Sequence, residues 1–346
     1  MPIIPSLAER ALLRLGVIPA PLVDFLQHAS FRLLLAGHRL GVFAALEDGP
    51  LTLDELVQRV GARSEGLEPL LDLLRRLGYL SRRGGRYANT ATTTRWLTGQ
   101  ARRSLMPALP FLDDFVRRWD HLEETIKEGR PPVTAYEFND LHPDRWPAFH
   151  DGMRTIALFT VDEVARKARL RAGPLRLLDV GGSHGLYTIA LCRRYPEMSA
   201  VIYDWPDGVA AAAREIARAG LSDRITTMTG DFLTDDLGAG YDVALLGNII
   251  HGQQPPAIHD LLRRLHDAMN RGGTLLILDQ VRMREPFTRF AGYAAALTGL
   301  LLLNELGGGI YPYTEVRAWL RETGYGDIRR RRLLRAPGNV LIQARR

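Results

Sequence analysis

Cysteine and lysine are scarce in this chain of 346 residues. The only cysteine is Cys192, so neither an internal disulfide nor a zinc site built from cysteines can form, and we expect no bound metal. A chain without disulfides suits the reducing cytoplasm, where we expect it to reside. Lysine occurs only at Lys127 and Lys167, and we attribute the arginine-rich net charge of +6 to genomic base composition.

Long hydrophobic runs are also absent. The longest, from Ala294 to Leu303, is interrupted by Thr298 and Gly299 and is well short of the ~20 apolar residues that a membrane-spanning helix needs. We therefore expect a buried helix there and no membrane partner. The first residues, Met1-Pro-Ile-Ile-Pro, lack the basic region that precedes the apolar core of a signal peptide.

A glycine-rich turn is present, but it matches neither of two common nucleotide-binding motifs. The segment Leu177-Leu-Asp-Val-Gly-Gly-Ser-His-Gly185 reads as an apolar strand, a turn and the start of a helix. Ser183 stands where a G-x-G-x-x-G motif would have its second glycine, and no G-K-[ST] follows. A second short strand ends in Asp204, at the separation where an acid accepts hydrogen bonds from a ribose.

A nucleoside ligand that carries no phosphate fits this pattern, and S-adenosylmethionine (SAM) is the commonest such cofactor. The alternative is an ordinary tight turn in a sheet that binds nothing. We favour the ligand because Asp204, at the end of the second strand, is an independent match to a nucleoside site.

The second half of the chain alternates apolar strands with helices. We expect strands at 175–179, 200–203, 225–229, 241–246, 274–278 and 339–343, with helices between them at 186–194, 208–219, 257–269 and 314–323. This alternation predicts an α/β fold with a doubly wound, mostly parallel, Rossmann-like sheet, whose ligand lies outside the carboxyl ends of the strands.

The N-terminal part reads as a winged helix. Apolar residues recur at helical spacing over residues 22–46, and Thr52 with Glu55 forms a capping box before a helix at 53–60. A second helix at 65–77 and a hairpin around residues 82–85 complete the pattern. We therefore expect a winged-helix domain at 1–104, a helical linker and substrate-chamber segment at 105–172, and a SAM-binding domain at 173–346.

Winged helices often bind DNA, so dimerisation has to be weighed against it. The second helix carries Glu65, Glu68 and Asp72, which would repel phosphate, and leucines cover much of its surface. The basic run Arg329–Arg332 lacks interleaved aromatic residues and reads as a solvated strand rather than a nucleic-acid patch. We expect a homodimer through the N-terminal domain and no nucleic acid.

Five segments in order give the chain a resemblance to the caffeate-type O-methyltransferases, a family of plant enzymes and bacterial tailoring enzymes. The resemblance covers nearly the whole chain. The matching segments are Phe149-His-Asp-Gly-Met153, Leu178-Asp-Val-Gly-Gly182, Asp204-Trp-Pro206, Gly230-Asp-Phe232 and the strand from Asp242 to His251. The resemblance implies a SAM-dependent enzyme that releases S-adenosylhomocysteine and methylates a small-molecule acceptor.

The resemblance also implies roles for individual residues. Those expected at the cofactor are Asp179, Gly181, Gly182, Asp204, Trp205, Asp231, Phe232 and Asn248, and those expected at the substrate are Phe149, His150, Met153 and Asn304. His251 is the expected general base, and Asp279, at the end of the next strand, is expected to orient its ring. The alternatives are a turn role for Asp231, simple packing for Trp205 and a pocket-lining role for His251.

The chain departs from the family pattern beside the histidine, and this leaves the reaction open. Gly247 replaces a lysine, Gly252-Gln253 replaces an Asp-Trp pair, and Tyr311 stands where a second acid is usual. The leading interpretation is O-methylation of a bulky aromatic or polyketide-like molecule. The alternatives are C-methylation, non-methylating chemistry with SAM, and a winged-helix regulator with SAM as its effector.

Overall fold

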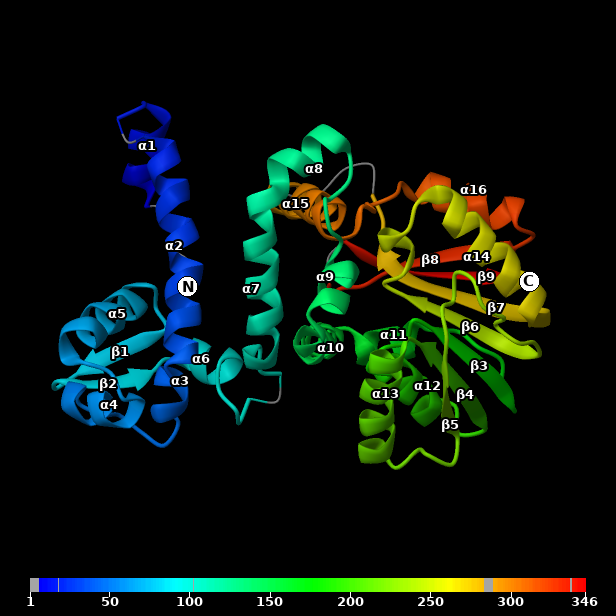
Figure 1. Ribbon diagram of the computed structural model, residues 1–346, viewed down its shortest axis with the longest axis horizontal. Helices are drawn as coiled ribbons and strands as arrows, with labels where there is room; N and C mark the ends of the chain where they lie inside the picture. The colour runs from blue at the N-terminus through cyan, green and yellow to red at the C-terminus, as the bar shows by residue number, and fades with distance from the viewer. Residues whose placement is uncertain (1–5, 18, 102, 283–288, 337) are drawn as a thin grey trace. The chain divides into compact units, whose positions relative to one another are not determined.

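The computed structural model describes residues 6–17, 19–101, 103–282, 289–336 and 338–346. Contacts divide the chain into two compact units, Met1–Leu109 and Pro110–Arg346 (Figure 1). The first unit holds α1 to α6, a two-stranded sheet and a short 3-10 helix, η1 (Met106–Ala108). The second unit holds a seven-stranded sheet and the remaining helices.

The first unit has the helix–helix–hairpin order of a winged helix. Its elements are α1 (Leu7–Arg14), α2 (Ala20–Arg39), α3 (Val42–Ala45), α4 (Leu53–Val60), α5 (Ser64–Arg76), β1 (Leu80–Arg83), β2 (Arg86–Asn89) and α6 (Ala91–Trp96). The predicted capping box is confirmed, because the Glu55 carboxylate accepts the Thr52 backbone N–H at 2.6 Å and the Glu55 N–H donates to the Thr52 hydroxyl at 3.3 Å. β1 and β2 pair antiparallel as the predicted hairpin.

The N-terminal half of α2 leaves an apolar face in water. Leu22, Phe25 and Leu26 are 57%, 67% and 62% exposed, whereas Leu34 and Leu35 in the second half are buried. Contacts between α2 and α5 account for part of that burial. The apolar positions that recur from residue 22 onward are therefore exposed in the first half of α2 and buried in the second.

The sheet of the second unit is mostly parallel, as predicted. Its strands lie in the order β5-β4-β3-β6-β7-β9-β8, and only β9 runs against the others. Their bounds are β3 (Leu175–Val180), β4 (Met198–Asp204), β5 (Ile225–Thr229), β6 (Tyr241–Gly247), β7 (Met269–Gln280), β8 (Gly326–Arg332) and β9 (Asn339–Arg345). β8 is the exposed edge strand expected for the arginine run.

Helices cover both faces of this sheet (Figure 1). The helices α11 (Val161–Lys167), α12 (Leu186–Arg194) and α13 (Pro206–Ala219) pack on one face, and α14 (Pro255–Ala268) and α16 (Tyr313–Glu322) pack on the other. Successive residues of β3 face opposite cores, with Leu177 in one and Leu178 in the other. A strand buried on both faces explains the continuous apolar runs in the sequence.

The remaining helices of the second unit contribute to the two cores mainly through Ala157 and Ile250. They are α7 (Leu109–Arg118), η2 (Trp119–His121), α8 (Leu122–Glu128), α9 (Ala135–Leu141), η3 (Pro143–Arg145), α10 (Trp146–Ala157), η4 (Ile250–Gly252) and α15 (Arg289–Leu306). Among the described residues, none of the helices has both the length and the apolar character needed to cross a membrane.

The expectation of a buried helix at residues 294–303 was right about the helix and wrong about its burial. α15 contains this segment, but within the chain Tyr293 is 65% exposed and Leu297 is 40% exposed. α15 packs on α8, α9 and η4 near its C-terminal end, where Leu302, Asn304 and Glu305 are buried. Its sequence is apolar on all sides, so the pattern could not show which side stays open.

Candidate active site

The glycine turn after β3 exposes backbone at the carboxyl edge of the sheet. Gly181 has φ +65°, and a Cβ there would lie 2.4 Å from Cδ1 of Ile249. A Cβ on Gly182 would lie 2.7 Å from the carboxyl carbon of Asp179. Only glycine fits at both positions, so the turn can approach a ligand closely.

Asp179 lies beneath this turn and is buried. The hydroxyl of Thr188 donates to its carboxylate at 2.6 Å, and burial raises the pKa of Asp179 to about 7. Asn248, which follows β6, has φ +59°, and its backbone N–H donates to the Leu278 carbonyl at 2.8 Å. Both residues therefore help to shape the carboxyl edge of the sheet where the cofactor is expected.

Asp204 ends β4 beside the glycine turn. Its two oxygens accept backbone N–H groups of Ser183 at 2.6 Å and Trp205 at 2.7 Å, and burial raises its pKa to about 6. A Cβ on Gly208 would lie 2.4 Å from this carboxyl carbon, so glycine makes room for the acid. An ionised carboxylate has about four lone-pair sites, so acceptor capacity remains for the two hydroxyls of a ribose.

Asp231 and Phe232 follow β5, one strand further along the edge. The Asp231 carboxylate accepts the Leu233 N–H at 2.9 Å, which is the turn role considered as an alternative. The Phe232 ring reaches the glycine turn, where its edge lies 3.5 Å from a Cβ placed on Gly181. A flat ring beside bare backbone is a suitable surface for adenine.

His251 lies in η4, just after β6, and is paired with an acid from the neighbouring strand. Its Nδ1 lies 2.6 Å from Oδ1 of Asp279, and both side chains are buried. The other oxygen of Asp279 accepts the backbone N–H groups of Ile250 at 3.0 Å and of His251 at 3.4 Å. An ionised carboxylate only accepts, so the tautomer that fits this contact has its proton on Nδ1 and its lone pair on Nε2.

The segment after α15 holds the backbone of His251 in place. The Gly309 N–H donates to the His251 carbonyl at 2.8 Å, and a Cβ on Gly308 would lie 1.9 Å from that oxygen. Tyr311, which stands where the resemblance leads us to expect an acid, donates its hydroxyl to the Gln253 carbonyl at 2.5 Å. This segment therefore supports the histidine through backbone contacts.

An aromatic cluster lies beside Asp204 and consists of Tyr136, Trp146, Phe149 and Trp205. Tyr136 stacks on Trp146 at 6.3 Å and meets Phe149 and Trp205 edge-on at 5.8 and 5.4 Å. Burial raises the pKa of Tyr136 to about 12, with a further contribution from the charges of Asp204 and Asp279. Tyr136 could not be identified from the sequence, because nothing in its local sequence distinguishes it from a packing residue.

α10 carries three of the four predicted substrate residues, and the fourth, Asn304, lies on α15. Phe149, which lines the aromatic cluster, and Met153 are partly buried on this helix. A Cβ on Gly152 would lie 2.4 Å from the Phe111 ring, which explains the glycine in the Phe149–Met153 motif. His150, expected at the substrate, instead meets the glycine turn through its Nδ1, 2.7 Å from the Ser183 hydroxyl.

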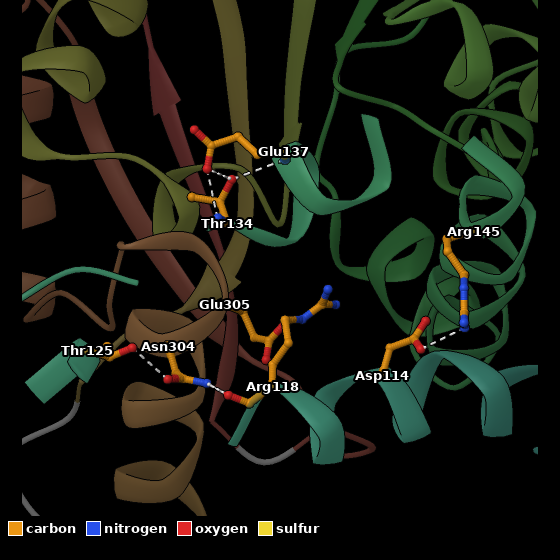
Figure 2. A network of polar contacts seen from close by, with 8 residues as sticks. All are labelled: Asp114, Arg118, Thr125, Thr134, Glu137, Arg145, Asn304 and Glu305. Carbon is orange, nitrogen blue, oxygen red and sulfur yellow. Dashed lines mark hydrogen bonds and ion pairs between the residues drawn. The ribbon is translucent and has the colours of Figure 1, made fainter. Parts of the chain in front are cut away.

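A buried polar network ties α7, α8 and α15 together (Figure 2). Arg118 pairs with Glu305, and burial raises the pKa of Glu305 to about 7 in spite of that partner. Asn304, expected at the substrate, accepts from the Thr125 hydroxyl at 2.8 Å and donates to the Arg118 carbonyl at 3.0 Å. Both ends of its amide are therefore engaged within the protein.

The described residues offer no group of three or more His, Cys, Asp or Glu side chains able to hold a metal ion. The donor set at the carboxyl edge is instead made of backbone, carboxylates and aromatic rings. That set fits an adenosyl group, with bare glycine backbone, an acid with spare lone pairs and a flat apolar ring.

Comparison with known proteins agrees with this geometry. Residues 119–326 match the family model of the O-methyltransferase domain, and residues 25–99 match the O-methyltransferase dimerisation domain. The chain is 30% identical over 321 residues to the 3-hydroxy-5-methyl-1-naphthoate 3-O-methyltransferase of Streptomyces sahachiroi, covering 89% of this chain and 90% of that protein. It is 27% identical to the tetracenomycin polyketide synthesis 8-O-methyl transferase of Streptomyces glaucescens, covering 86% and 88%.

Solved structures share the fold over the full length. Human N-acetylserotonin methyltransferase, determined with SAM, superposes with a TM-score of 0.82 at 24% identity, covering 100% of this chain and 99% of that one. Mitomycin 7-O-methyltransferase also gives a TM-score of 0.82 at 24% identity, covering 99% and 100%. The chain therefore belongs to the O-methyltransferase family and is a SAM-dependent methyltransferase.

Proposed function

We propose that this enzyme methylates a hydroxyl group of a bulky aromatic or polyketide-like small molecule, with His251 as the general base. The observation that carries the proposal is the contact of 2.6 Å between Nδ1 of His251 and Oδ1 of Asp279. A carboxylate on Nδ1 fixes one tautomer of the imidazole and stabilises the imidazolium that forms when Nε2 takes a proton.

The chemistry requires little more than a base and correct placement. SAM supplies a methyl group on a sulfonium, which is already an activated electrophile. A phenol has a pKa near 10, so an imidazole with a pKa near 6.5 can remove its proton as the new carbon–oxygen bond forms. His251 would hold that proton, and the aromatic cluster would hold the acceptor ring beside the cofactor.

The proposed class of acceptor is supported by the aromatic cluster and by the relatives. Tyr136, Trp146 and Phe149 form an aromatic wall that suits a flat, apolar molecule. The two Streptomyces relatives are named for a hydroxynaphthoate and for a polyketide pathway, and both are O-methyltransferases. We propose that Phe149 and Met153 contact the acceptor, and the role expected for Asn304 there stays a prediction.

We propose cofactor contacts for the residues gathered at the carboxyl edge. They are Asp179, Gly181, Gly182, Asp204, Trp205, Asp231, Phe232 and Asn248. We also propose that the enzyme is a homodimer formed through its N-terminal domain, as the match to a dimerisation domain supports. The three-part division at residues 104 and 172 and the cytoplasmic location stay predictions.

The test is turnover with SAM and a panel of hydroxynaphthoates and hydroxylated polyketides, read by mass spectrometry. General-base catalysis contributes about 10²–10⁴-fold, so we expect His251→Ala to lower turnover by about that factor while binding of S-adenosylhomocysteine survives. Asp279→Asn should lower it less, because it disturbs the orientation of the ring without removing the base. His259→Ala is the matched control, since His259 lies on α14 outside the site.

We expect the fall in turnover of His251→Ala to lie at the low end of that range. Tyr311 stands where the resemblance implies a second acid, and its hydroxyl is bonded to the Gln253 carbonyl. Near-native turnover in His251→Ala would show that the enzyme only positions its acceptor. C-methylation or non-methylating chemistry would then be the better interpretation, and the mass of the product would distinguish the two.

A further inference from the structure

His150 connects α10, the helix of Phe149 and Met153, to the glycine turn after β3. Its Nδ1 lies 2.7 Å from the hydroxyl of Ser183, and its ring stacks on Trp146 at 5.5 Å and 21°. Ser183 has φ +44°, a left-handed conformation that is uncommon for serine. The same serine donates its backbone N–H to Asp204 at 2.6 Å, so His150 and Asp204 are held at one turn.

The second nitrogen of His150 has no protein partner. The side chain is 6% exposed, and its Nε2 is buried without a hydrogen bond to any described residue. An unsatisfied buried polar atom costs free energy in the unliganded protein, and a bound ligand that pairs with it removes that cost. Such an atom beside the glycine turn therefore points to a ligand group.

The order of the strands indicates which group that is. Asp231 follows β5 and Asp204 ends β4, while His251 follows β6 on the far side of β3. A cofactor with its adenine at Asp231 and its ribose at Asp204 directs its sulfonium methyl toward His251. The amino-acid chain that leaves the same sulfur then meets the turn after β3, where Ser183 and His150 lie.

We propose that Nε2 of His150 donates a hydrogen bond to the carboxylate at the amino-acid end of the cofactor, with the Ser183 hydroxyl fixing the ring. Ser183 donates to Nδ1, which leaves the proton on Nε2. His150 is thus assigned to the cofactor rather than to the acceptor. The inference rests on the adenosyl placement at Asp204 proposed above.

The His150 ring is neutral, and one positive charge acts on it. Burial lowers the pKa of His150 to about 4, and the positive charge of Arg214 adds to the effect. Burial likewise lowers the pKa of the neighbouring His184 to about 3, with contributions from His150 and Arg154. Both imidazoles are therefore neutral at pH 7, and Arg154 is itself paired with Glu215 at 3.1 Å. A neutral imidazole N–H with the guanidinium charge of Arg214 nearby can donate to a carboxylate.

The experiment compares three ligands by calorimetry. S-adenosylhomocysteine has the whole amino-acid end, its decarboxylated analogue keeps only the amine, and 5′-methylthioadenosine lacks both. His150→Phe keeps a ring against Trp146 and removes both nitrogens. We expect it to weaken S-adenosylhomocysteine by about tenfold or more, the effect of one lost hydrogen bond to a charged group, and to leave the other two ligands unchanged.

Two further variants make the result specific. His150→Gln places an amide N–H near the position of Nε2 and should restore part of the affinity. Asp204→Ala should weaken all three ligands, and if it weakens none, the adenosyl placement itself is wrong. Equal weakening of all three ligands by His150→Phe would show a purely structural role, and weakening of the decarboxylated analogue would show a contact with the amine instead. Unchanged binding of S-adenosylhomocysteine to His150→Phe would overturn the inference outright.

Discussion

Asp204 is buried enough for its ionisation to control binding near neutral pH. Its pKa is raised by burial to about 6, so the carboxyl is neutral below that pH in the folded protein and ionised above it. A protonated carboxyl loses acceptor capacity toward the ribose. We expect affinity for S-adenosylhomocysteine to fall by up to about tenfold per pH unit below 6, because a proton must be removed for full binding.

Calorimetry at pH 5.0 and pH 7.5 would measure this change. The sign follows from the raised pKa, since affinity is gained as pH rises through about 6. Asp204→Asn is the control, because an amide does not titrate and should bind weakly at both values. A pH dependence that persists in Asp204→Asn would mean that another group is responsible.

Gly308 lies against the backbone of His251, the proposed base, and leaves room for it by having no side chain. An added Cβ would lie 1.9 Å from the His251 carbonyl, so Gly308→Ala must displace the backbone of η4. We expect a loss of stability of about 1–3 kcal/mol, as for overpacking in a filled site, together with a marked fall in turnover. Thermal unfolding and turnover would be measured together.

Gly309 provides the matched substitution for this prediction. A Cβ there would meet nothing within 4 Å, although its N–H makes the bond to His251. Gly309→Ala should therefore remain near wild type in both measurements. If the two variants behave alike, the close contact at Gly308 does not control the position of His251.

At the scale of elements, the Arg118–Glu305 pair joins α7 to α15 (Figure 2). The segment after α15 contacts the backbone of His251. The raised pKa of Glu305 shows that burial of its charge outweighs the attraction of Arg118. Removing one partner leaves an uncompensated buried charge, so we expect Glu305→Leu to destabilise the fold by about 3–5 kcal/mol. Chemical denaturation would measure the free energy of unfolding.

The double substitution Arg118→Met with Glu305→Leu tests this account of the pair. Replacement of a buried pair by apolar residues is often neutral or stabilising, so the double variant should recover most of the loss. A double variant whose loss equals the sum of the single losses would show that the two side chains act independently.

Elements with strong local signals could be predicted from the sequence. The strand, glycine turn, helix and second strand from Leu175 to Asp204 are marked by an apolar run, two glycines and a terminal acid. The pairing of His251 with Asp279 also followed, because β6 and β7 are neighbours and their carboxyl ends meet. In both cases the chain order alone brings the residues together.

Contacts between distant segments could not be predicted in this way. Arg118 and Glu305 are 187 residues apart, and His150 reaches Ser183 across 33 residues, so both pairs depend on how the helices outside the sheet pack. Tyr136 joins the aromatic cluster for the same reason. The open side of α15 was missed because an evenly apolar helix has no marked face.

At the scale of the whole molecule, the exposed apolar face of α2 supports the proposal that the chain forms a homodimer. Leu22, Phe25 and Leu26 form a contiguous stripe at helical spacing, within a segment that largely matches a dimerisation domain. A stripe of large apolar residues in water marks an interaction surface, because covering it recovers about 25 cal/mol for each Å² removed from water. We expect a dimer at micromolar concentration by sedimentation velocity.

Charges placed on this stripe should separate the protomers. Phe25→Glu with Leu26→Glu puts two like charges at the centre of the contact, where burial without a partner is strongly unfavourable. Leu334→Glu is the control, because Leu334 is 83% exposed and belongs to the other unit. We expect the double variant to sediment as a monomer and the control as a dimer. A double variant that stays dimeric would place the contact on another surface, of which the open side of α15 is the first to test.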